Sequence, residues 1–214
     1  MGSATTTKGD KSEPQENRPA RSKGKARAAD ILKAAGKILI DSGYAQLTMR
    51  SVADEAGVRL SHLQYYFPTK HDLVRGLTRH VASNYLRNCD SVLSSVPDTP
   101  TARFMAWVDF LIDDCWMPQT RRYFIQLWGL LESEDACKGV LLREFYENDV
   151  REILKLLRDL SPHMDESELQ CRATIIAGMV EGMMLFAGNE SFDFDDKALK
   201  AETRRQIFKI ATEQ

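Results

Sequence analysis

The sequence comprises 214 residues with a mass of 24.3 kDa, and 43% of the residues are hydrophobic, enough to bury the core of one large or two small domains. Its four cysteines are widely separated and include no C-x-x-C pair, which argues against a zinc site or a compact disulfide framework and favours a reducing cytoplasm. No segment is long and apolar enough to indicate a signal peptide or a membrane span, so we expect no membrane role.

The net charge of −2 conceals an uneven distribution. Residues 1–70 carry 12 Lys and Arg against 7 Asp and Glu, whereas residues 71–214 carry 17 against 24. A basic N-terminal part indicates either contact with a polyanion or a solvated basic tail. Composition alone leaves both interpretations open.

Residues 1–24 hold almost no apolar side chains, and we expect them to form a disordered arm. Basic residues gather toward the end of this arm, where they could follow DNA as homeodomain arms do, or could simply increase solubility. These residues are Arg18, Arg21, Lys23, Lys25 and Arg27.

Three helices are expected next. Apolar residues at helical spacing predict a first helix from Lys25 to Gly43, because glycine favours the left-handed conformation that ends a helix. Thr48 is placed to cap a second helix, which Gly57 closes. The third helix follows after one turn and stops before Pro68, because proline disfavours helical geometry in the residue before it.

Beyond Phe67, prolines and apolar periodicity divide the chain into further helices. They are expected over residues 69–96, 101–117, 119–134, 137–160, 165–188 and 196–212. No run alternates with the period of two that a half-buried strand requires. The sequence therefore predicts an all-α protein with about nine helices.

Residues 48–66 fit two helices joined by a tight turn. Ala53 is small where the two helices would cross, Gly57 permits the turn, and Leu63 points back into a small core. The opposite face of the second helix presents donors, acceptors and flat rings of the kind that contact base edges and phosphates in a major groove. The residues on that face are Arg59, Ser61, His62, Gln64, Tyr65 and Tyr66.

The stretch from Ala29 to Val74, which includes LTMRSVADEAGVRLSHLQYYFPTKHDL, resembles the N-terminal DNA-binding domain of the tetracycline-repressor (TetR) family of bacterial transcriptional regulators. The likeness lies in an ordered set of features, from Ser-Gly-Tyr after the first helix to an aromatic cluster before Pro-x-Lys. It implies a three-helix helix-turn-helix DNA-binding domain over residues 25–72. It also implies a helical effector-binding and dimerisation domain over residues 73–214.

The resemblance implies DNA contacts at four further positions of the first domain. Thr48 and Lys70 would hold phosphates, and Tyr66 would contact the DNA backbone. Arg50, early in the second helix, would touch a base or a phosphate.

The same resemblance implies a set of groove-facing residues. Tyr65 either joins them or belongs to the core. Gln64 departs from the tyrosine that is common at this position in the family, and its amide can pair bidentately with adenine. The groove-facing set is Arg59, Ser61, His62 and Gln64.

The sequence offers no positive sign of catalysis. His62, His71 and His80 recur every nine residues, which is not a ligand spacing within one helix turn. No G-x-S-x-G or comparable motif presents a nucleophile. We therefore expect no enzyme activity, no metal and no cofactor.

The run from Ala173 to Gly188, ATIIAGMVEGMMLFAG, is apolar nearly all round. Such a helix must be buried, and its seam of small residues would let another backbone approach closely. In TetR-like proteins the last two helices form a four-helix dimer interface, and the alternative is a central core helix of a monomer. The seam consists of Ala173, Ala177, Gly178 and Gly182.

The resemblance also places several aromatic residues in helices that line the effector cavity of similar proteins. Aromatic walls would suit a small, mainly apolar ligand, and the carboxylates Asp109 and Asp113 would favour a cation. The alternative is that most of these aromatics are ordinary core residues. The candidate ligand contacts are Trp107, Phe110, Asp113 and Trp128.

Together these features predict a homodimeric repressor that binds an inverted repeat in double-stranded DNA and leaves it when a small-molecule effector binds. One alternative is an activator or a nucleoid-associated protein. The other is a helical small-molecule-binding protein or enzyme with a vestigial DNA-binding motif. Salt-dependent, sequence-selective DNA binding would exclude the second alternative.

Overall fold

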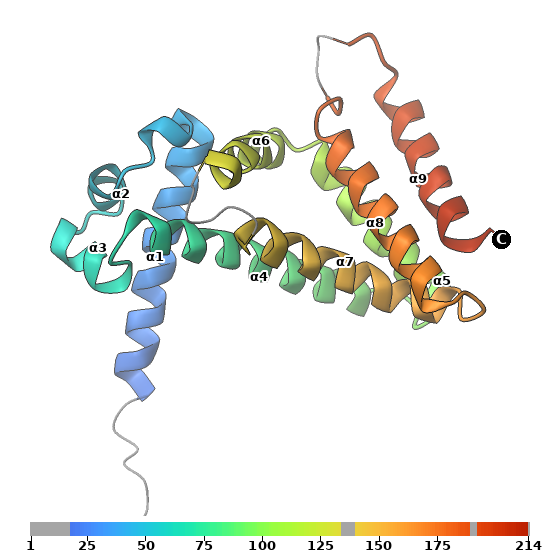
Figure 1. Ribbon diagram of the computed structural model, residues 1–214, viewed down its shortest axis with the longest axis horizontal. Coiled ribbons are helices and arrows are strands. Elements are labelled where there is room, and N and C mark those ends of the chain that lie inside the picture. The colour runs from blue at the N-terminus through green and yellow to red at the C-terminus, as the bar shows by residue number, and fades with distance from the viewer. Residues whose placement is uncertain (1–17, 134–139, 189–191, 214) are drawn as a thin grey trace, which may run out of the picture.

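The computed structural model describes residues 18–133, 140–188 and 192–213, and all regular structure in these ranges is helical, as the sequence predicts (Figure 1). None of the described helices combines the length and the apolarity that crossing a bilayer requires. The elements are α1 (Arg18–Ser42), the 3-10 helix η2 (Tyr44–Gln46), α2 (Met49–Glu55), α3 (Leu60–Tyr66), α4 (Lys70–Ser94), α5 (Pro100–Cys115), α6 (Pro118–Ser133), α7 (Val140–Leu160), α8 (Glu166–Met183) and α9 (Asp196–Thr212).

Local capping explains where the helices around the turn begin and end. The Thr48 side chain accepts a hydrogen bond from the Ser51 N–H at 3.0 Å, and the Ser51 hydroxyl accepts one from the Thr48 N–H at 3.0 Å. Thr69 and Asp72 form the same reciprocal cap at the start of α4. Gly57 turns the chain after α2 with a φ of 63°. The predicted roles of Thr48 and Gly57 are thus confirmed.

The first helix begins earlier than the sequence predicts. It starts at Arg18, so residues 18–24, expected in a disordered arm, are helical. Alanine, arginine and lysine favour helix in this stretch, and Pro19 falls in the first turn, where a missing N–H leaves no hydrogen bond unmade. Residues 1–17 of the expected arm, and the first residues of the helix expected over 137–160, lie outside the described ranges.

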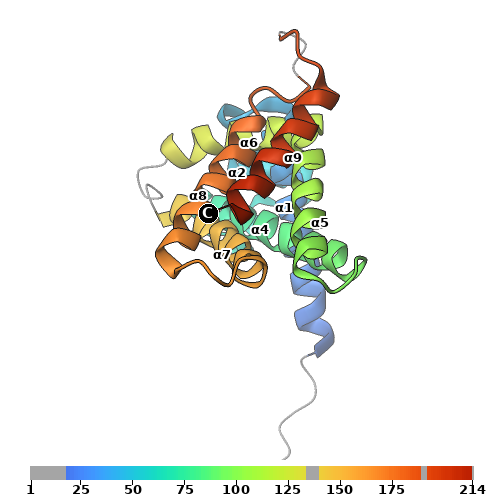
Figure 2. The ribbon, with the colours of Figure 1, turned by 90° about the vertical axis from the view of Figure 1, so that its right-hand side faces the viewer.

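The helices form an elongated molecule with two ends. Helices α1, α2 and α3 occupy one end, and α5, α8 and α9 gather at the other (Figures 1 and 2). The 25-residue α4 runs from the first end to the second, a length of roughly 37 Å at about 1.5 Å per residue. The domain boundary expected at residue 72 falls in the first turn of α4, so this helix is common to both parts.

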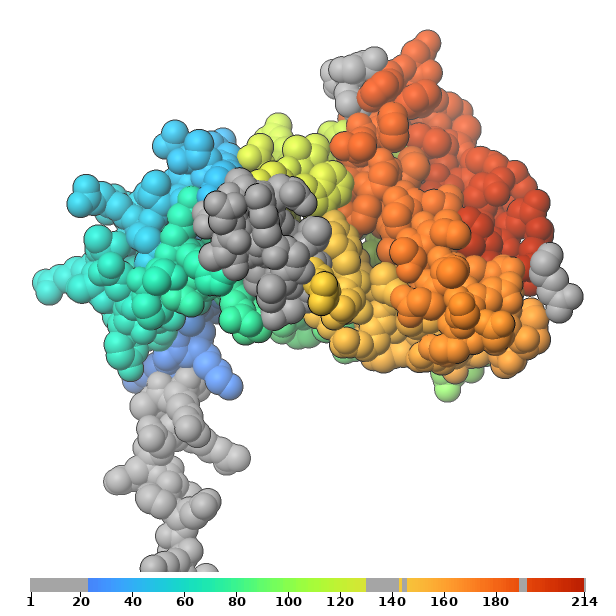
Figure 3. All heavy atoms as spheres, in the orientation of Figure 1, coloured from blue at the N-terminus to red at the C-terminus, as the bar shows by residue number. Residues whose placement is uncertain are grey.

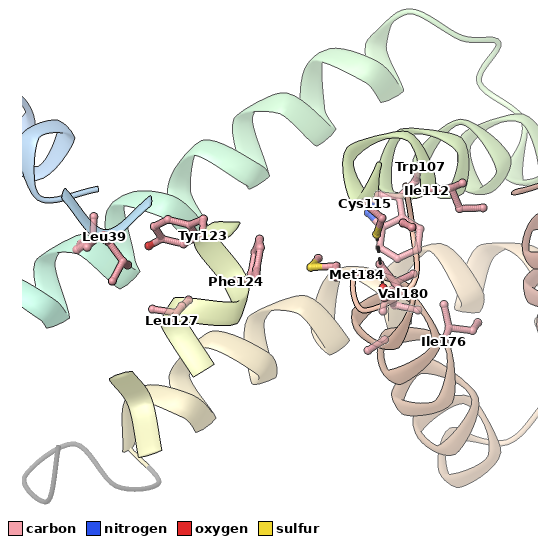
Figure 4. Close-up of a cluster of buried hydrophobic side chains, with 14 of the residues drawn as sticks. Leu39, Trp107, Ile112, Cys115, Tyr123, Phe124, Leu127, Ile176, Val180 and Met184 are labelled. Atoms are coloured by element: carbon pink, nitrogen blue, oxygen red, sulfur yellow. Dashed lines mark hydrogen bonds between the residues drawn. The ribbon is translucent and has the colours of Figure 1, made fainter. Parts of the chain in front are cut away.

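Buried side chains form a continuous core that joins the two ends. Figure 4 shows two parts of it, one where α6 packs near Leu39 of α1, and one where α5 faces α8. The Cys115 thiol donates a hydrogen bond to the Val180 carbonyl at 3.4 Å in the second part. Because the core is continuous, a displacement of α6 would also shift the side chains of α1 that pack against it.

Candidate DNA-binding surface and effector cavity

Helices α2 and α3 are joined by a tight turn that exposes one face of α3. The Val58 N–H donates to the Ala53 carbonyl at 2.9 Å across the turn. Ala53 and Leu63 are buried, as the sequence predicts for the positions that fix α3 from behind. A helix of two turns held in this way can enter a major groove with its outer face.

Phe67 anchors the end of α3 against α4. Its side chain is buried, and its ring lies so close to Gly76 that a Cβ there would be 2.6 Å from a ring carbon. Only glycine fits at this close approach of α4 to the aromatic ring, which therefore helps set the position of α3 relative to α4.

The structure places the proposed DNA contacts on one exposed end of the molecule (Figure 3). Tyr65 is 79% exposed, so the alternative that it belongs to the core is wrong. Tyr66 and Lys70 are half-buried. The exposed residues of the proposed set are Thr48, Arg50, Arg59, Ser61, His62, Gln64 and Tyr65.

Three neighbouring aromatic rings on α3 support one another. The Tyr66 ring lies 5.4 Å from the His62 ring and meets the Tyr65 ring edge to face at 5.2 Å, between centroids. Such contacts restrict the rotamers of exposed side chains before they meet a partner. Tyr66 therefore acts as a support for its two neighbours in addition to any contact of its own hydroxyl.

The proposed phosphate contacts are also positioned by neighbours. Lys70 is the first residue of α4, and its ammonium lies 4.0 Å from the centre of the Tyr44 ring in η2. The Thr48 hydroxyl lies 2.9 Å from the Ser51 hydroxyl within the α2 cap.

Arg27 is a basic residue that belongs to this surface although it lies on α1. It lines an open hollow together with Arg59, Ser61, His62 and Tyr65 of the α3 region. The sequence places Arg27 both among the basic residues at the end of the arm and in the first turn of the predicted first helix. Only the tertiary structure brings it to the same hollow as His62.

A cavity lies inside the second part of the molecule, between α4, α5, α6, α7 and α8. It offers about 40 Å³ to the centres of water molecules. Its lining is Ala82, Tyr85, Leu86, Cys89, Trp107, Leu111, Asp114, Phe124, Asn148, Asp149, Glu152, Ile153, Ala177, Val180, Glu181 and Met184.

The expected ligand contacts divide between the cavity and other places. Trp107 lines the cavity. Phe110 packs on Tyr85 with 6.4 Å between ring centres but is not part of the lining, and Trp128 lines a neighbouring groove with Tyr146. Asp113 is exposed and pairs with Lys200 of α9 at 2.7 Å.

Asp113 is therefore corrected to a surface ion pair, and Asp109 likewise pairs with Arg204 of α9 at 2.6 Å. Successive residues of a helix point about 100° apart, so Asp114 turns inward where Asp113 turns outward. Apolar periodicity alone did not show which of the two neighbouring aspartates points into the cavity.

Four carboxylates line the cavity, and none of them was among the predicted ligand contacts. Asp114, Asp149 and Glu152 lie in strongly amphipathic helices where acidic residues are common, so nothing marked them out. Glu181 did carry a signal, since it is the single charge in the apolar run from Ala173 to Gly188. A lone carboxylate in such a helix indicates a buried role.

Within the described ranges, one side chain donates a hydrogen bond to the Glu181 carboxylate. Tyr146 donates from its hydroxyl at 3.3 Å, and the Trp128 indole N–H in turn donates to the Tyr146 oxygen at 2.6 Å. Burial and the nearby charge of Asp149 raise the pKa of Glu181 to about 7. Burial and the charge of Glu152 raise the pKa of Asp149 to about 6.

The comparisons with known proteins agree with this geometry. Residues 31–77, from α1 through α2 and α3 into α4, match the family model of bacterial regulatory proteins of the tetR family. The chain belongs to the TetR family. It is 26% identical over 172 residues to the HTH-type transcriptional regulator BetI of Paraburkholderia phytofirmans, covering 80% of this chain and 87% of that protein.

Two solved structures share the fold of this TetR-family chain. One is a Pseudomonas aeruginosa PAO1 protein proposed to be a transcriptional regulator, with a TM-score of 0.69 and 20% identity, covering 91% of this chain and all of that chain. The other is a Saccharomonospora viridis protein in complex with choline, with a TM-score of 0.66 and 16% identity, covering 86% and 96% of the two chains. The TetR-family chain is thus a DNA-binding transcriptional regulator, and its relatives are regulators rather than enzymes.

The small-residue seam of α8 divides between two faces in this TetR-family protein. Ala173 and Ala177 are buried within the protomer, so they serve its own core. Gly178 is exposed and Gly182 is half-buried, and a Cβ at either would meet no atom within 4 Å. Only the outer part of the expected interface, with Ile175 exposed beside it, therefore lies on the surface.

Proposed function

We propose that this regulator is a homodimeric repressor that leaves its operator when a small organic effector occupies the cavity between α4 and α8. The observation that carries the proposal is the continuity of α4. Its first residue, Lys70, follows the recognition helix α3, and its later residues Tyr85 and Cys89 line the cavity. A ligand that displaces α4 would therefore also displace α3.

Helix α6 offers a second connection between the cavity and the DNA-binding end. Phe124 lines the cavity, and two residues later the Gln126 side-chain oxygen accepts a hydrogen bond from the Tyr44 N–H at 3.2 Å. Tyr44 belongs to η2, directly before α2, and its ring lies under Lys70. Movement of α6 would be transmitted to the start of the helix-turn-helix.

The cavity ligand would act through a difference in affinity between two arrangements. A ligand that binds both arrangements equally shifts nothing, so the effector must favour the dimer geometry in which the two α3 helices no longer match the DNA. The hydrogen bonds from Tyr85 and Thr120 to Asp114 tie α4, α5 and α6 together at the cavity. They are contacts that an incoming ligand can rearrange.

On DNA, α3 would lie in the major groove with Arg59, Ser61, His62 and Gln64 toward the bases. Their exposure on one outer face supports this assignment. Phosphate contacts are proposed for Thr48, Arg50, Tyr66 and Lys70, with Tyr65 beside them, and Arg27 of α1 joins the set because it lines the same hollow as Arg59.

The outer face of α8, with Gly178 and Gly182, is the proposed contact between protomers, with α9 beside it. These two helices lie at the end of the molecule away from α3 (Figures 1 and 3). A two-fold dimer presents α3 twice in opposite directions, so the operator should be an inverted repeat with half-site centres roughly 34–36 Å apart or more. Transcriptional control of this kind takes place on chromosomal DNA, which implies a cytoplasmic location.

A solved structure of the same fold holds choline, which supports a small organic molecule as the type of effector for this chain. The test is selection of bound fragments from genomic DNA, followed by footprinting and measurement of affinity at several salt concentrations. We expect one or a few inverted-repeat sites that overlap promoters. Binding with no sequence preference, or sites spread along the genome away from promoters, would contradict the proposal.

A further inference from the structure

We propose that the effector is a small organic cation, an amine or a quaternary ammonium ion, held between Asp149 and Glu181 against the rings of Tyr85 and Trp107. This inference rests on the proposed role of the cavity as the effector site. It goes further because it names the chemical class of the ligand and the two groups that select it.

The charge of the cavity is one-sided. Its described lining holds four carboxylates and no Lys, Arg or His. Burying a carboxylate without a positive partner is unfavourable, and an anionic ligand would add to the repulsion. A cation would relieve it.

Two of the four carboxylates already have partners in the protein. Asp114 accepts hydrogen bonds from the hydroxyls of Tyr85 and Thr120, the latter at 3.1 Å. Glu152 pairs with Lys155 on the outer side of α7 at 2.7 Å. These two carboxylates therefore have no need of a ligand.

Asp149 and Glu181 differ from that pair. Among the described residues, Asp149 has neither a hydrogen bond nor an ion pair, and Glu181 has only the long hydrogen bond from Tyr146. They lie on the packed helices α7 and α8, close enough for the charge of Asp149 to act on Glu181. A single positive group between them would attract both carboxylates and offset one of their two negative charges.

The remaining walls favour an organic cation over a metal ion. The rings of Tyr85, Trp107 and Phe124 line the cavity, and the faces of aromatic rings attract ammonium groups. Magnesium and calcium ions instead require a shell of six or more oxygen ligands, which aromatic faces do not supply.

The size of the cavity sets the size of the cationic group. The 40 Å³ open to water centres shows a small cavity that holds only a few water molecules. An alkylated ammonium group needs somewhat more, so its entry requires α4 and α7 to separate slightly. Because α4 leads to α3, that separation is the movement that the proposed function needs.

Protonation gives the inference a second observable. With a pKa of about 7 for Glu181 and about 6 for Asp149, the empty cavity holds protons near neutral pH that a cation would displace. The other titratable groups around the pair are Tyr85 and Cys89 on α4, Asp114 and Cys115 on α5, and Tyr146 and Glu152 on α7. Cation affinity should therefore rise by about tenfold or more between pH 5.5 and 8.

The experiment measures calorimetric binding to the full-length protein without DNA, using charged probes and neutral molecules of the same shape. The pairs are choline with 3,3-dimethylbutan-1-ol, and n-butylammonium with 1-pentanol, and butyrate and MgCl2 serve as further probes. We expect each cation to bind at least tenfold more tightly than its neutral counterpart, and more tightly at pH 8 than at pH 5.5. Asp149→Asn and Glu181→Gln should each reduce that preference by about tenfold or more.

Glu147→Gln is the matched control, because Glu147 is an exposed carboxylate of α7 outside the cavity. It should leave the preference for cations unchanged. Thermal unfolding of every variant checks that loss of binding is not loss of folding.

Four results would each overturn the inference. They are equal binding of cations and their neutral counterparts, no binding of any cation, tighter binding of Mg²⁺ than of the organic cations, and a preference for cations that the two cavity variants leave unchanged. A separate measurement of operator release tests the proposed function. Release of the operator by a neutral or anionic molecule would support control by an effector and contradict the proposal that the effector is a cation. Binding of a cation without release of the operator would support the cation site and contradict the repressor mechanism.

Discussion

Glu181→Gln should stabilise the protein at alkaline pH, because the substitution removes a buried charge and keeps its shape. The glutamine oxygen can still accept the hydrogen bond that Tyr146 donates to Glu181. The pKa of Glu181 rises from an ordinary 4.5 to about 7, and each pKa unit corresponds to about 1.4 kcal/mol. The full interval thus corresponds to roughly 3 kcal/mol.

The sign follows from which protonation state the fold favours. A raised pKa means that the folded protein favours the protonated carboxyl, so its contribution to stability is complete below about pH 4.5 and is lost as the pH rises through about 7. Because Glu181 is half-buried and retains some contact with water, we expect about half the full value, roughly 1–2 kcal/mol at pH 8. For a chain of this length that is a rise in Tm of roughly 2–8 °C.

The assay is thermal and urea unfolding of wild type and Glu181→Gln between pH 4.5 and 8, without ligand and at one protein concentration, since a dimer's stability depends on concentration. The two proteins should be equally stable at pH 4.5 and diverge as the pH rises. Glu147→Gln, on the exposed side of α7, should stay within about 0.5 kcal/mol of wild type throughout. A difference that is absent at pH 8, or that is the same at every pH, would refute the buried-charge explanation.

Gln64→Ala should weaken operator binding by about tenfold or more and relax preference at one symmetric pair of bases, as measured on an operator with each base substituted in turn; a uniform loss would make Gln64 a backbone contact. Lys70→Ala should weaken binding to all sequences alike and lower the salt slope by about one unit per protomer, and a loss confined to one operator would contradict the phosphate contact. Gly178→Leu should give a folded monomer by analytical ultracentrifugation, since a Cβ at this exposed position meets no atom within 4 Å in the protomer; a dimer with intact operator affinity would move the interface elsewhere. Gln126→Leu should retain effector binding but change the effector's influence on DNA affinity by about fivefold, the worth of one hydrogen bond to Tyr44, whereas Gln126→Glu, which keeps an acceptor, should respond like wild type.

Much of the DNA-binding end could be predicted from the sequence because its determinants are local. Thr48 caps α2 through a residue three positions later, Gly57 supplies the turn, and Pro68 limits α3, all within one short stretch. The position of α1's start was missed because helix propensity continues through residues whose low apolar content indicated disorder.

The dimer face illustrates a limit of periodicity. The sequence predicted that the apolar run from Ala173 to Gly188 is buried on most sides, whereas α8 of the protomer leaves a face with Ile175 and Gly178 exposed. The sequence could not say which side meets the protomer's own core. Ala173 and Gly178 have similar patterns around them, yet the packing of α8 on α7 and α5 buries the first and exposes the second.

The sequence by itself determined the helical class, the helix-turn-helix and the residues on the outer face of α3, since each depends on contacts between residues a few positions apart. Only the tertiary structure decided that Asp113 pairs outward with Lys200 while Asp149 and Glu181 share a cavity, and that Arg27 and His62 line the same hollow. The residues of each pair come from helices separated by tens of residues. Which aspartate of α5 points inward depends on a shift of a single position along the helix. The meeting of each pair depends on how whole helices cross, which is decided by the packing of the complete core rather than by any local pattern.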